Sequence, residues 1–382
     1  TISATPSTQV SSVSFTDITV NGMTINFTAG DGSNSIVLVK TGSAVNSNPV
    51  NTSSYTASTT FGSGSQIGTG NYVVYNGTGN SVTITGLNPG TTYYVAVYSF
   101  NGSGGTENYL TSSPATGNQT TSNTDYRSVA SGNWSSAATW EKYNGSAWVS
   151  STDFPTSNIG SITIQAGHTV AVDTSITIDE ATIATGGQIT VNATKTLTIA
   201  NGNGTDLTIN GYLKNQGAIA LSSSPAISVN GTYEHAVNGG TIPASTWNSG
   251  STCLITGITS TMANGFSQSF YNLTYNCASQ SASLNMGMYN TTVNGDFNYL
   301  NGGASATETG LSNSAAGAGP NNVLTFNGNF NVNSSINTNQ ICAHRSGSAS
   351  TVTNLTVNIM GNLNITNGSF YLTRNTGIAT MN

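Results

Sequence analysis

The sequence predicts an all-β protein in which an N-terminal β-sandwich is followed by a right-handed parallel β-helix. Three observations lead to this fold class. Short runs of alternating apolar and polar residues fill the chain, and Gly, Asn or Pro bounds most of them. Ser, Thr, Asn and Gly occupy the polar positions, which favours strands and turns over helices. A phrase centred on glycine recurs through the second half of the chain.

The composition excludes several classes of protein. Only 7 basic and 13 acidic residues occur among 382, whereas about a quarter of a typical chain is charged. Seven basic residues are too few for a nucleic-acid interface. No apolar run approaches the roughly 18 residues of a membrane-spanning helix. The 3 cysteines are too few for a disulfide scaffold and lack zinc-ligand spacing. The 3 histidines and 13 acidic residues are too scattered to assemble a metal site, so we expect no metal or cofactor.

Residues 1–121 carry the pattern of a β-sandwich, in runs such as "MTINFTAG", "SIVLVK" and "TYYVAVYSF". In the segment "GLNPGTTYYVAVYSFNG", Leu87, Pro89, Gly90 and Tyr93 match the L-x-P-G-x-x-Y corner of fibronectin type III domains. The segment from "NYVVYNG" to "GNQTT" resembles the fibronectin-like modules of secreted Bacteroidota surface proteins, which are mostly spacers. The resemblance implies that the Tyr93 hydroxyl bonds to the backbone at the preceding turn. The long insert "TSSYTASTTFGSGSQIGTG" departs from ordinary type III domains but fits this bacterial kind.

Residues 122–157 are predicted to form a linker and an aromatic-rich N-terminal cap. The polar connector "TTSNTD" shows no apolar periodicity and marks the boundary. The segment after it contains Trp134, Trp140 and Trp148. The end of a stack of repeats exposes its apolar core, so large aromatic side chains are expected to cover that end. The alternative role for these three side chains is a platform on which sugars stack.

Residues 158–382 carry the recurring phrase, centred on Gly211, Gly231, Gly295, Gly328 and Gly361. The last two intervals are both 33 residues, the first is 20 and the remaining one is 64. Periods of 20 to 50 residues indicate stacked repeats. The segments "NWSSAATW", "AGHTVAVD" and "GGTIPASTWNSGSTCLITGITS" resemble β-helical parts of large Bacteroidota cell-surface proteins, over most of 125–382.

Within one copy of the phrase, Leu324, Phe326, Gly328, Phe330 and Val332 fall on one face of an extended strand. Each copy therefore predicts one turn of a β-helix, with every apolar residue directed to a shared interior. Phe297, Phe330 and Leu363 are expected to be buried in successive turns. Because Asn-Gly is also a strong hairpin signal, an antiparallel sandwich or meander remains the alternative.

The nearest approach to a catalytic cluster is His168 with Asp173, Asp179 and Glu180. Asp179 and Glu180 are adjacent, so on a strand they point to opposite faces and cannot pair. A structural role for His168 in its Gly-His turn is the favoured interpretation. His235 has inward parity and is expected to be a core or edge histidine.

His344 and Arg345 are expected in a loop, "ICAHRSGSAS", without an acidic neighbour. Cys253 and Cys277 are 24 residues apart, near one turn, which predicts a disulfide or direct packing. The third cysteine, Cys342, is not part of this predicted pair. No residue is assigned a catalytic, cofactor-binding or metal-binding role.

The function that the sequence favours is a non-enzymatic extracellular module, structural or adhesive, of a secreted bacterial cell-surface or filament protein. Its expected partners are cell-surface glycans or copies of itself, in a polymer or filament. The alternative is a glycan-binding or glycan-cleaving β-helix of the polysaccharide lyase or hydrolase kind. The N-terminus "TISATPSTQV" lacks the features of a signal peptide, so we expect a processed or internal fragment.

Overall fold

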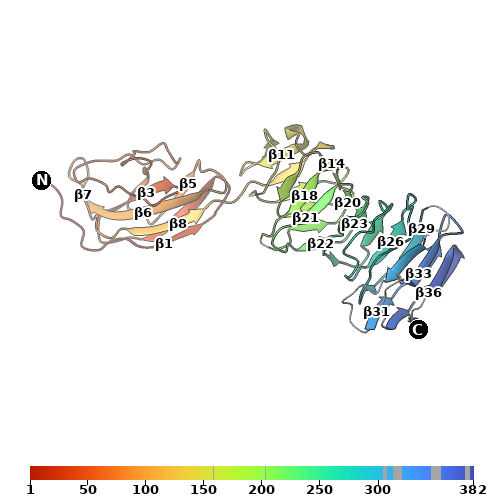
Figure 1. Ribbon diagram of the computed structural model, residues 1–382. Helices are drawn as coiled ribbons and strands as arrows, with labels where there is room; N and C mark the ends of the chain where they lie inside the picture. Colours follow the sequence, from red (N-terminus) through yellow and green to blue (C-terminus); the bar gives the residue numbers. More distant parts are fainter. Residues whose placement is uncertain (158, 203, 304–307, 313–320, 346–353, 375–378) are drawn as a thin grey trace. The chain divides into compact units, whose positions relative to one another are not determined.

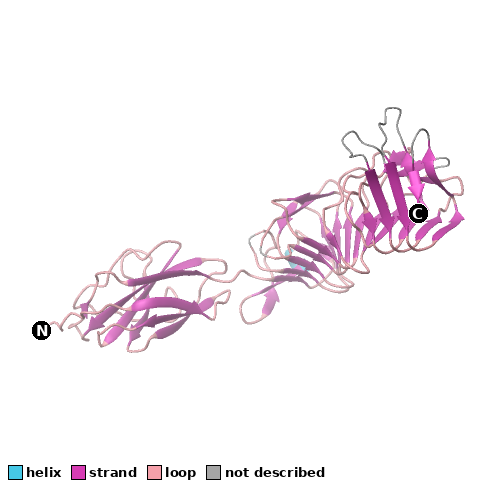
Figure 2. Ribbon diagram, turned by 90° about the horizontal axis from the view of Figure 1, so that it is seen from below, coloured by secondary structure: helices cyan, strands magenta, loops and turns pink. Residues whose placement is uncertain are grey.

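The computed structural model describes residues 1–157, 159–202, 204–303, 308–312, 321–345, 354–374 and 379–382. It is all-β: in these residues the one helical element is a short 3-10 turn, η1 (Ala137–Thr139), and strands make up the rest of the regular structure (Figure 2). The chain forms two compact units, the first essentially Thr1–Asp125 and the second chiefly Ser161–Asn382 together with Tyr126–Glu141 (Figure 1).

The first unit is a fibronectin type III-like sandwich of two antiparallel sheets. One sheet has the order β1-β2-β5, and the other has the order β4-β3-β6-β7 with β8 also on β6. The strands are β1 (Ser11–Thr16), β2 (Gly22–Thr28), β3 (Asn34–Thr41), β4 (Tyr72–Gly77), β5 (Ser81–Thr85), β6 (Thr92–Asn101), β7 (Asn108–Tyr109) and β8 (Ala115–Thr120).

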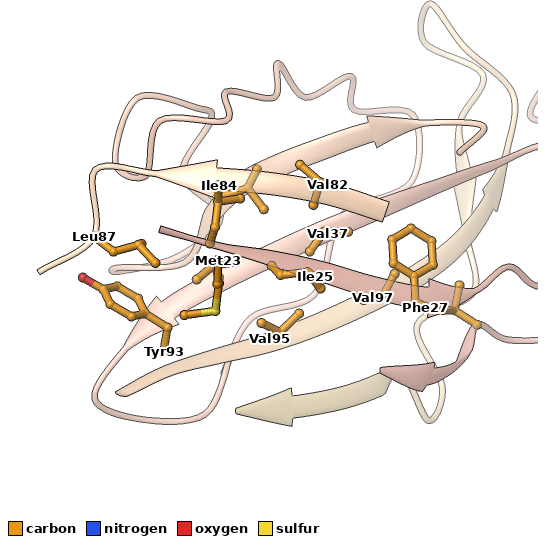
Figure 3. Packing of buried hydrophobic residues seen from close by; sticks show 13 residues of the cluster. Met23, Ile25, Phe27, Val37, Val82, Ile84, Leu87, Tyr93, Val95 and Val97 are labelled. Carbon is orange, nitrogen blue, oxygen red and sulfur yellow. The ribbon is translucent and has the colours of Figure 1, made fainter. Parts of the chain in front are cut away.

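Alternating side chains of the two sheets meet in one apolar core, in which Met23, Ile25 and Ile84 face Val37 and Val95 (Figure 3). A second apolar cluster lies on the other face of β3, around Ile36, Leu38 and Ile67. The long insert between β3 and β4 supplies Ile67 and half-buried partners to this cluster. Strand β3 is therefore buried on both faces, which explains its continuous apolar sequence.

The tyrosine corner has the geometry that the motif implies. Tyr93 is fully buried, and its hydroxyl accepts a hydrogen bond from the backbone N–H of Asn88 over 2.8 Å. Leu87 packs in the same core. The hydroxyl therefore ties the turn before β6 to the first residues of that strand.

We predict that Tyr93→Phe weakens the first unit by about 1 kcal/mol, because it removes one hydrogen bond while leaving the ring in the core. Hydrogen–deuterium exchange of peptides from β3 and β6 should accelerate about fivefold. Tyr94→Phe, on the opposite face of β6, is the matched control. Equal exchange in both variants would contradict the role of the corner.

The second unit is built mainly from parallel strand pairs. The longest has ten strands: β10 (Gly132–Asn133), β14 (Thr169–Val172), β17 (Gln188–Val191), β20 (Tyr212–Asn215), β23 (Thr232–His235), β25 (Thr252–Ile255), β26 (Asn272–Asn276), β29 (Phe297–Asn301), β32 (Phe330–Asn333) and β35 (Leu363–Asn367). The next has eight: β12 (Trp148–Ser150), β11 (Trp140–Tyr143), β9 (Tyr126–Ser128), β13 (Ile162–Ile164), β16 (Ala181–Ile183), β19 (Leu207–Ile209), β22 (Ile227–Val229) and β24 (Thr246–Trp247).

Three shorter sheets complete the unit. The first contains β15 (Ile176–Ile178), β18 (Thr196–Ile199) and β21 (Ala218–Leu221). The second contains β27 (Leu284–Asn285), β30 (Glu308–Ser312), β33 (Gln340–Arg345) and β36 (Ser369–Arg374). The third contains β28 (Thr292–Val293), β31 (Asn321–Phe326), β34 (Asn354–Ile359) and β37 (Ala379–Met381). From β13 to β21, consecutive strands enter three sheets in rotation, and each of β13 to β18 pairs with the strand three places later. Such long parallel sheets fit a β-helix.

The antiparallel alternative is wrong. Strand β31 precedes Asn327-Gly328 and strand β32 follows it, but the two strands belong to different sheets. Phe326 pairs in parallel with Ile359 and Phe330 pairs in parallel with Leu363, both at the 33-residue interval. The prediction of one extended strand through Gly328 is also wrong, because the glycine forms a corner between two strands.

Glycine is required at this corner because neighbouring turns approach closely. A Cβ atom on Gly328 would fall well inside van der Waals contact with the carbonyl oxygen of Gly295. Gly361 has the same relation to Gly328, and Gly231 to Gly211. The 64-residue interval from Gly231 to Gly295 contains three turns, and Ser251 and Tyr271 occupy the two corners between these glycines.

The interior of the second unit is a stack of like side chains. Phe297 and Phe330 are fully buried with ring centroids 4.7 Å apart. Leu363 continues this column, but it is 38% exposed, so the prediction of its burial is wrong. Among the residues that the structure describes, β35 stands last in the order of its sheet, and no strand of these residues covers Leu363.

We predict that Gly328→Ala destabilises the second unit by about 1–3 kcal/mol, as expected for an overpacked site. The added methyl group must displace the Gly295 carbonyl and with it the hydrogen bond that Gly328 N–H donates there. Thermal unfolding is the measurement, and Asn327→Ala is the control, because that side chain is exposed. A smaller loss in Gly328→Ala than in Asn327→Ala would refute the steric explanation.

Candidate functional site

The residues of the predicted catalytic cluster have separate structural partners. His168 Nδ1 lies 2.9 Å from the hydroxyl of Ser128. Asp173 accepts hydrogen bonds from the backbone N–H and the hydroxyl of Ser135, at 3.0 and 2.5 Å. Burial acts to raise the pKa of Asp173, but the bonds from Ser135 outweigh it and the pKa is lowered. Both side chains thus tie β14 and its turns to the segment before them.

Asp179 does have a carboxyl partner, but the partner is Asp206 and not the adjacent Glu180. Asp206 is fully buried and accepts hydrogen bonds from the backbone N–H groups of Gly202 and Ala226, each at 2.6 Å. Burial, and then the hydrogen bond and charge of Asp206, raise the pKa of Asp179. Sequence reasoning missed Asp206, which lies one turn away; only the register between turns would have found it.

His235 is a core histidine, as its parity indicates. It is fully buried, its Nε2 lies 2.7 Å from the carbonyl oxygen of Gly239, and its Nδ1 lies 3.1 Å from the Tyr233 hydroxyl. Burial lowers the pKa of His235, and the bond to Gly239 only partly opposes this. The ring is therefore neutral and structural.

The predicted disulfide between Cys253 and Cys277 is absent, because both are free and buried. Cys253 pairs with Leu273 at an interval of 20 residues. Cys277 lies four residues beyond Leu273, so the 24-residue spacing exceeds the local turn and offsets the two thiols. Burial raises the pKa of the Cys277 thiol to about 11, and Cys342 is also buried.

The loop predicted at His344 and Arg345 is in fact the end of strand β33. His344 pairs with Ser312 and Thr373 in neighbouring strands. The side chains of His344 and Arg345 are outside the part that the structure describes.

The tryptophans do not form an exposed platform. Trp134 and Trp140 are buried, with ring centroids 4.8 Å apart, and their indole N–H groups donate to the carbonyl oxygens of Pro155 and Trp134. Trp148 is half-buried. Strands β9 and β10 of the predicted cap segment pair in parallel with β13 and β14.

The outer faces of the parallel sheets carry ordered polar rows. Asn298, Asn331 and Asn364 stand in register on the ten-stranded sheet, and each amide donates to the one before it, at 2.9 and 2.8 Å. A second row is formed on the eight-stranded sheet by Thr163, Thr182, Thr208, Ser228 and Thr246. These rows are neutral and repeat at about the 4.8 Å spacing of strands.

An ion pair between Glu234 and Lys214 interrupts the outer face of the ten-stranded sheet. Glu234 is only 6% exposed, accepts hydrogen bonds from Tyr212 and Thr256 at 2.7 Å each, and pairs with Lys214 at 3.1 Å. Burial acts to raise the pKa of Glu234, but the bonds from Tyr212, Thr256 and Lys214 lower it. The carboxylate is therefore ionised and fixes the Tyr212 ring. Sequence analysis did not single out any of these residues.

A groove of about 390 Å³ borders Tyr212. Five of its ten lining residues are glycines, and the others include Thr169, Gln188, Asn210 and Thr232. Among the described residues, no three His, Cys, Asp or Glu side chains are grouped so as to hold a metal ion. The same residues include no helix long and apolar enough to span a membrane.

The first unit defines a fibronectin type III-like protein module by its strand order and tyrosine corner. Residues 8–116 match the family model described as purple acid phosphatase, N-terminal domain. No curated protein matches the sequence.

Three solved structures are similar to part of the chain. A computer-redesigned β-sandwich protein is 18% identical, with 29% of this chain and 90% of that chain covered and a TM-score of 0.20. The fibronectin type III domain of human fibronectin type III domain containing protein 3 is 17% identical, with 32% and 91% covered and a TM-score of 0.20. A multidomain titin fragment is 13% identical, with 30% and 32% covered and a TM-score of 0.19.

The expectation that the chain is not an enzyme requires correction. The matched model describes the N-terminal domain of purple acid phosphatases, which are enzymes, although this domain alone is non-catalytic. The sequence predicts this type of sandwich and assigns it only the role of a spacer. The domain type therefore does not separate enzymes from structural proteins.

We predict opposite effects of two carboxyl replacements. Asp179→Asn should raise the melting temperature at pH 7, because the raised pKa of Asp179 means that its ionised form weakens the fold. The stability that the protonated Asp179 contributes is complete below the unfolded pKa of about 3.9 and is lost as pH rises through the folded pKa. The gain in melting temperature of Asp179→Asn should therefore vanish near pH 3.5.

Asp173→Asn is the matched control. The lowered pKa of Asp173 stabilises the fold above the unfolded pKa, so this variant should melt at a lower temperature at pH 7. Thermal unfolding at pH 7 and 3.5 measures both effects. A lower melting temperature of Asp179→Asn at pH 7 would show that the two carboxyl groups do not repel each other.

Proposed function

We propose that residues 158–382 form a right-handed parallel β-helix. We further propose that the chain is an extracellular structural or adhesive module of a secreted bacterial cell-surface or filament protein, of the kind found in Bacteroidota. In this proposal the first unit is a spacer, and the second unit makes contact with cell-surface glycans or with copies of itself. The rotation of consecutive strands through three sheets supports the β-helix, and parallel crossovers are right-handed in nearly all proteins.

The observation that carries the proposed contact function is the neutral amide row on the outer face of the ten-stranded sheet, at β29, β32 and β35. Besides the row of Asn298, Asn331 and Asn364, Asn362 donates to Asn329 at 3.2 Å. Each amide offers both donors and an acceptor, and these are the groups that pair with sugar hydroxyls or with other amides. Like charges normally keep β-surfaces apart, and this face has few of them.

We predict that the purified chain attaches to insoluble cell-surface glycans or associates with itself. Asn331→Asp places one carboxylate in the centre of the amide row and should reduce that contact severalfold. The physical reason is that the new charge must be desolvated without an opposite partner. Co-sedimentation with bacterial cell walls and analytical ultracentrifugation are the measurements.

The control is Thr116→Asp, which adds the same charge on exposed strand β8 of the first unit. It should leave contact unchanged, and melting temperatures must show that both variants fold. A chain that stays monomeric and binds neither cell walls nor isolated glycans would contradict the proposed function.

A further inference from the structure

The groove beside Tyr212 is a built feature of the second unit. Its lining residues come from four successive passes of the chain, at 167–169, 186–188, 210–212 and 231–232. His168, Gly187, Gly211 and Gly231 occupy the corner in these passes. The three glycines let successive turns approach closely, because a Cβ atom on any of them would meet a carbonyl oxygen of the neighbouring turn. The next corner residue, Ser251, lies beyond the groove. At about 4.8 Å between strands, the groove extends roughly 14 Å across the turns.

Tyr212 is held rigidly at the side of this groove. It begins strand β20, in register with Gln188 on one side and Thr232 on the other. Its hydroxyl donates to Glu234, which Lys214 and Thr256 hold in turn. Because the hydroxyl is already engaged, the ring is the part of Tyr212 that remains for a ligand. A fixed ring also loses little conformational entropy on binding.

The other side chains that line the groove are neutral hydrogen-bonding groups. Thr169 and Thr232 carry hydroxyls, and Gln188 and Asn210 carry amides. No charged residue lines it, and the volume of 390 Å³ lies within the range of about 300–1,000 Å³ for small-ligand sites. A matching ligand has many hydroxyl groups, one apolar face and no charge.

We propose that this groove is a binding subsite for a neutral polysaccharide, with one pyranose ring packed on Tyr212. The C–H face of a pyranose is apolar and is removed from water against the aromatic ring, while its hydroxyls reach the amides and threonines. The length of the groove across several turns suits a linear chain of sugars. This inference rests on the proposed function and names the surface that would bind glycans in it.

The test uses the full 382-residue chain with neutral β-glucan and mannan oligosaccharides of six units, in isothermal titration calorimetry. An anionic uronate oligosaccharide and a neutral peptide serve as comparison ligands. Tyr212→Ala should weaken binding of the neutral oligosaccharide at least tenfold. Tyr212→Phe keeps the ring and should stay within about threefold of the parent chain, and Tyr271→Ala, outside the groove, should bind as the parent chain does.

Melting temperatures establish that each variant is folded. If Tyr212→Ala unfolds, Gln188→Ala replaces it and should weaken binding severalfold. The subsite is refuted if a folded Tyr212→Ala or Gln188→Ala binds neutral oligosaccharides as tightly as the parent chain. It is refuted equally if only the uronate or the peptide binds. Attachment to cell walls that survives in Tyr212→Ala would refute the subsite while leaving the proposed function intact.

Discussion

The stacking of turns through parallel backbone hydrogen bonds is the constraint on which the second unit depends. Each position in a turn lies about 4.8 Å from its counterpart in the next, so every residue is placed against a near copy of its own environment. Like pairs that attract are therefore repeated, as in Phe297 with Phe330 and Asn331 with Asn298. A column of carboxylates or ammonium groups would repel itself at this distance, so neutral side chains are favoured in the outer columns of the second unit.

The same constraint decided how much of the fold could be predicted from sequence. The 33-residue period and the inward parity of Phe326 and Phe330 are local patterns, and the structure has the corresponding register. Parity could not distinguish a strand that continues through Gly328 from one that turns a corner there, because both keep alternate residues inside. The difference lies in the approach of the Gly295 carbonyl, which belongs to another turn. The cysteine pairing failed for a related reason, because one period was assumed where the local turn is 20 residues.

The candidate site was the least predictable part, since its groups come together only through register. Tyr212 and Glu234 belong to neighbouring strands, Thr256 directly follows the next strand of the sheet, and the three share no sequence motif. Asp206 carries no signal in its own segment, yet it fixes two turns and raises the pKa of Asp179. In the first unit the tyrosine corner was predictable, because Leu87, Pro89 and Tyr93 are close in sequence and the geometry is local.

The departures from the neutral repeat are therefore its most informative positions. A chain whose turns can repeat Thr, Asn and Gly has no structural need for a buried carboxylate on its outer face. Glu234 incurs a desolvation cost that its three partners offset, and the result is a tyrosine ring held still beside a groove. Asp179 incurs a similar cost with less compensation, since one of its oxygens is buried without a hydrogen-bond partner in the described residues. A buried charge whose cost is offset by several partners indicates a functional site. A fixed side chain favours binding of a ligand, whereas packing of the turns needs only the neutral repeat.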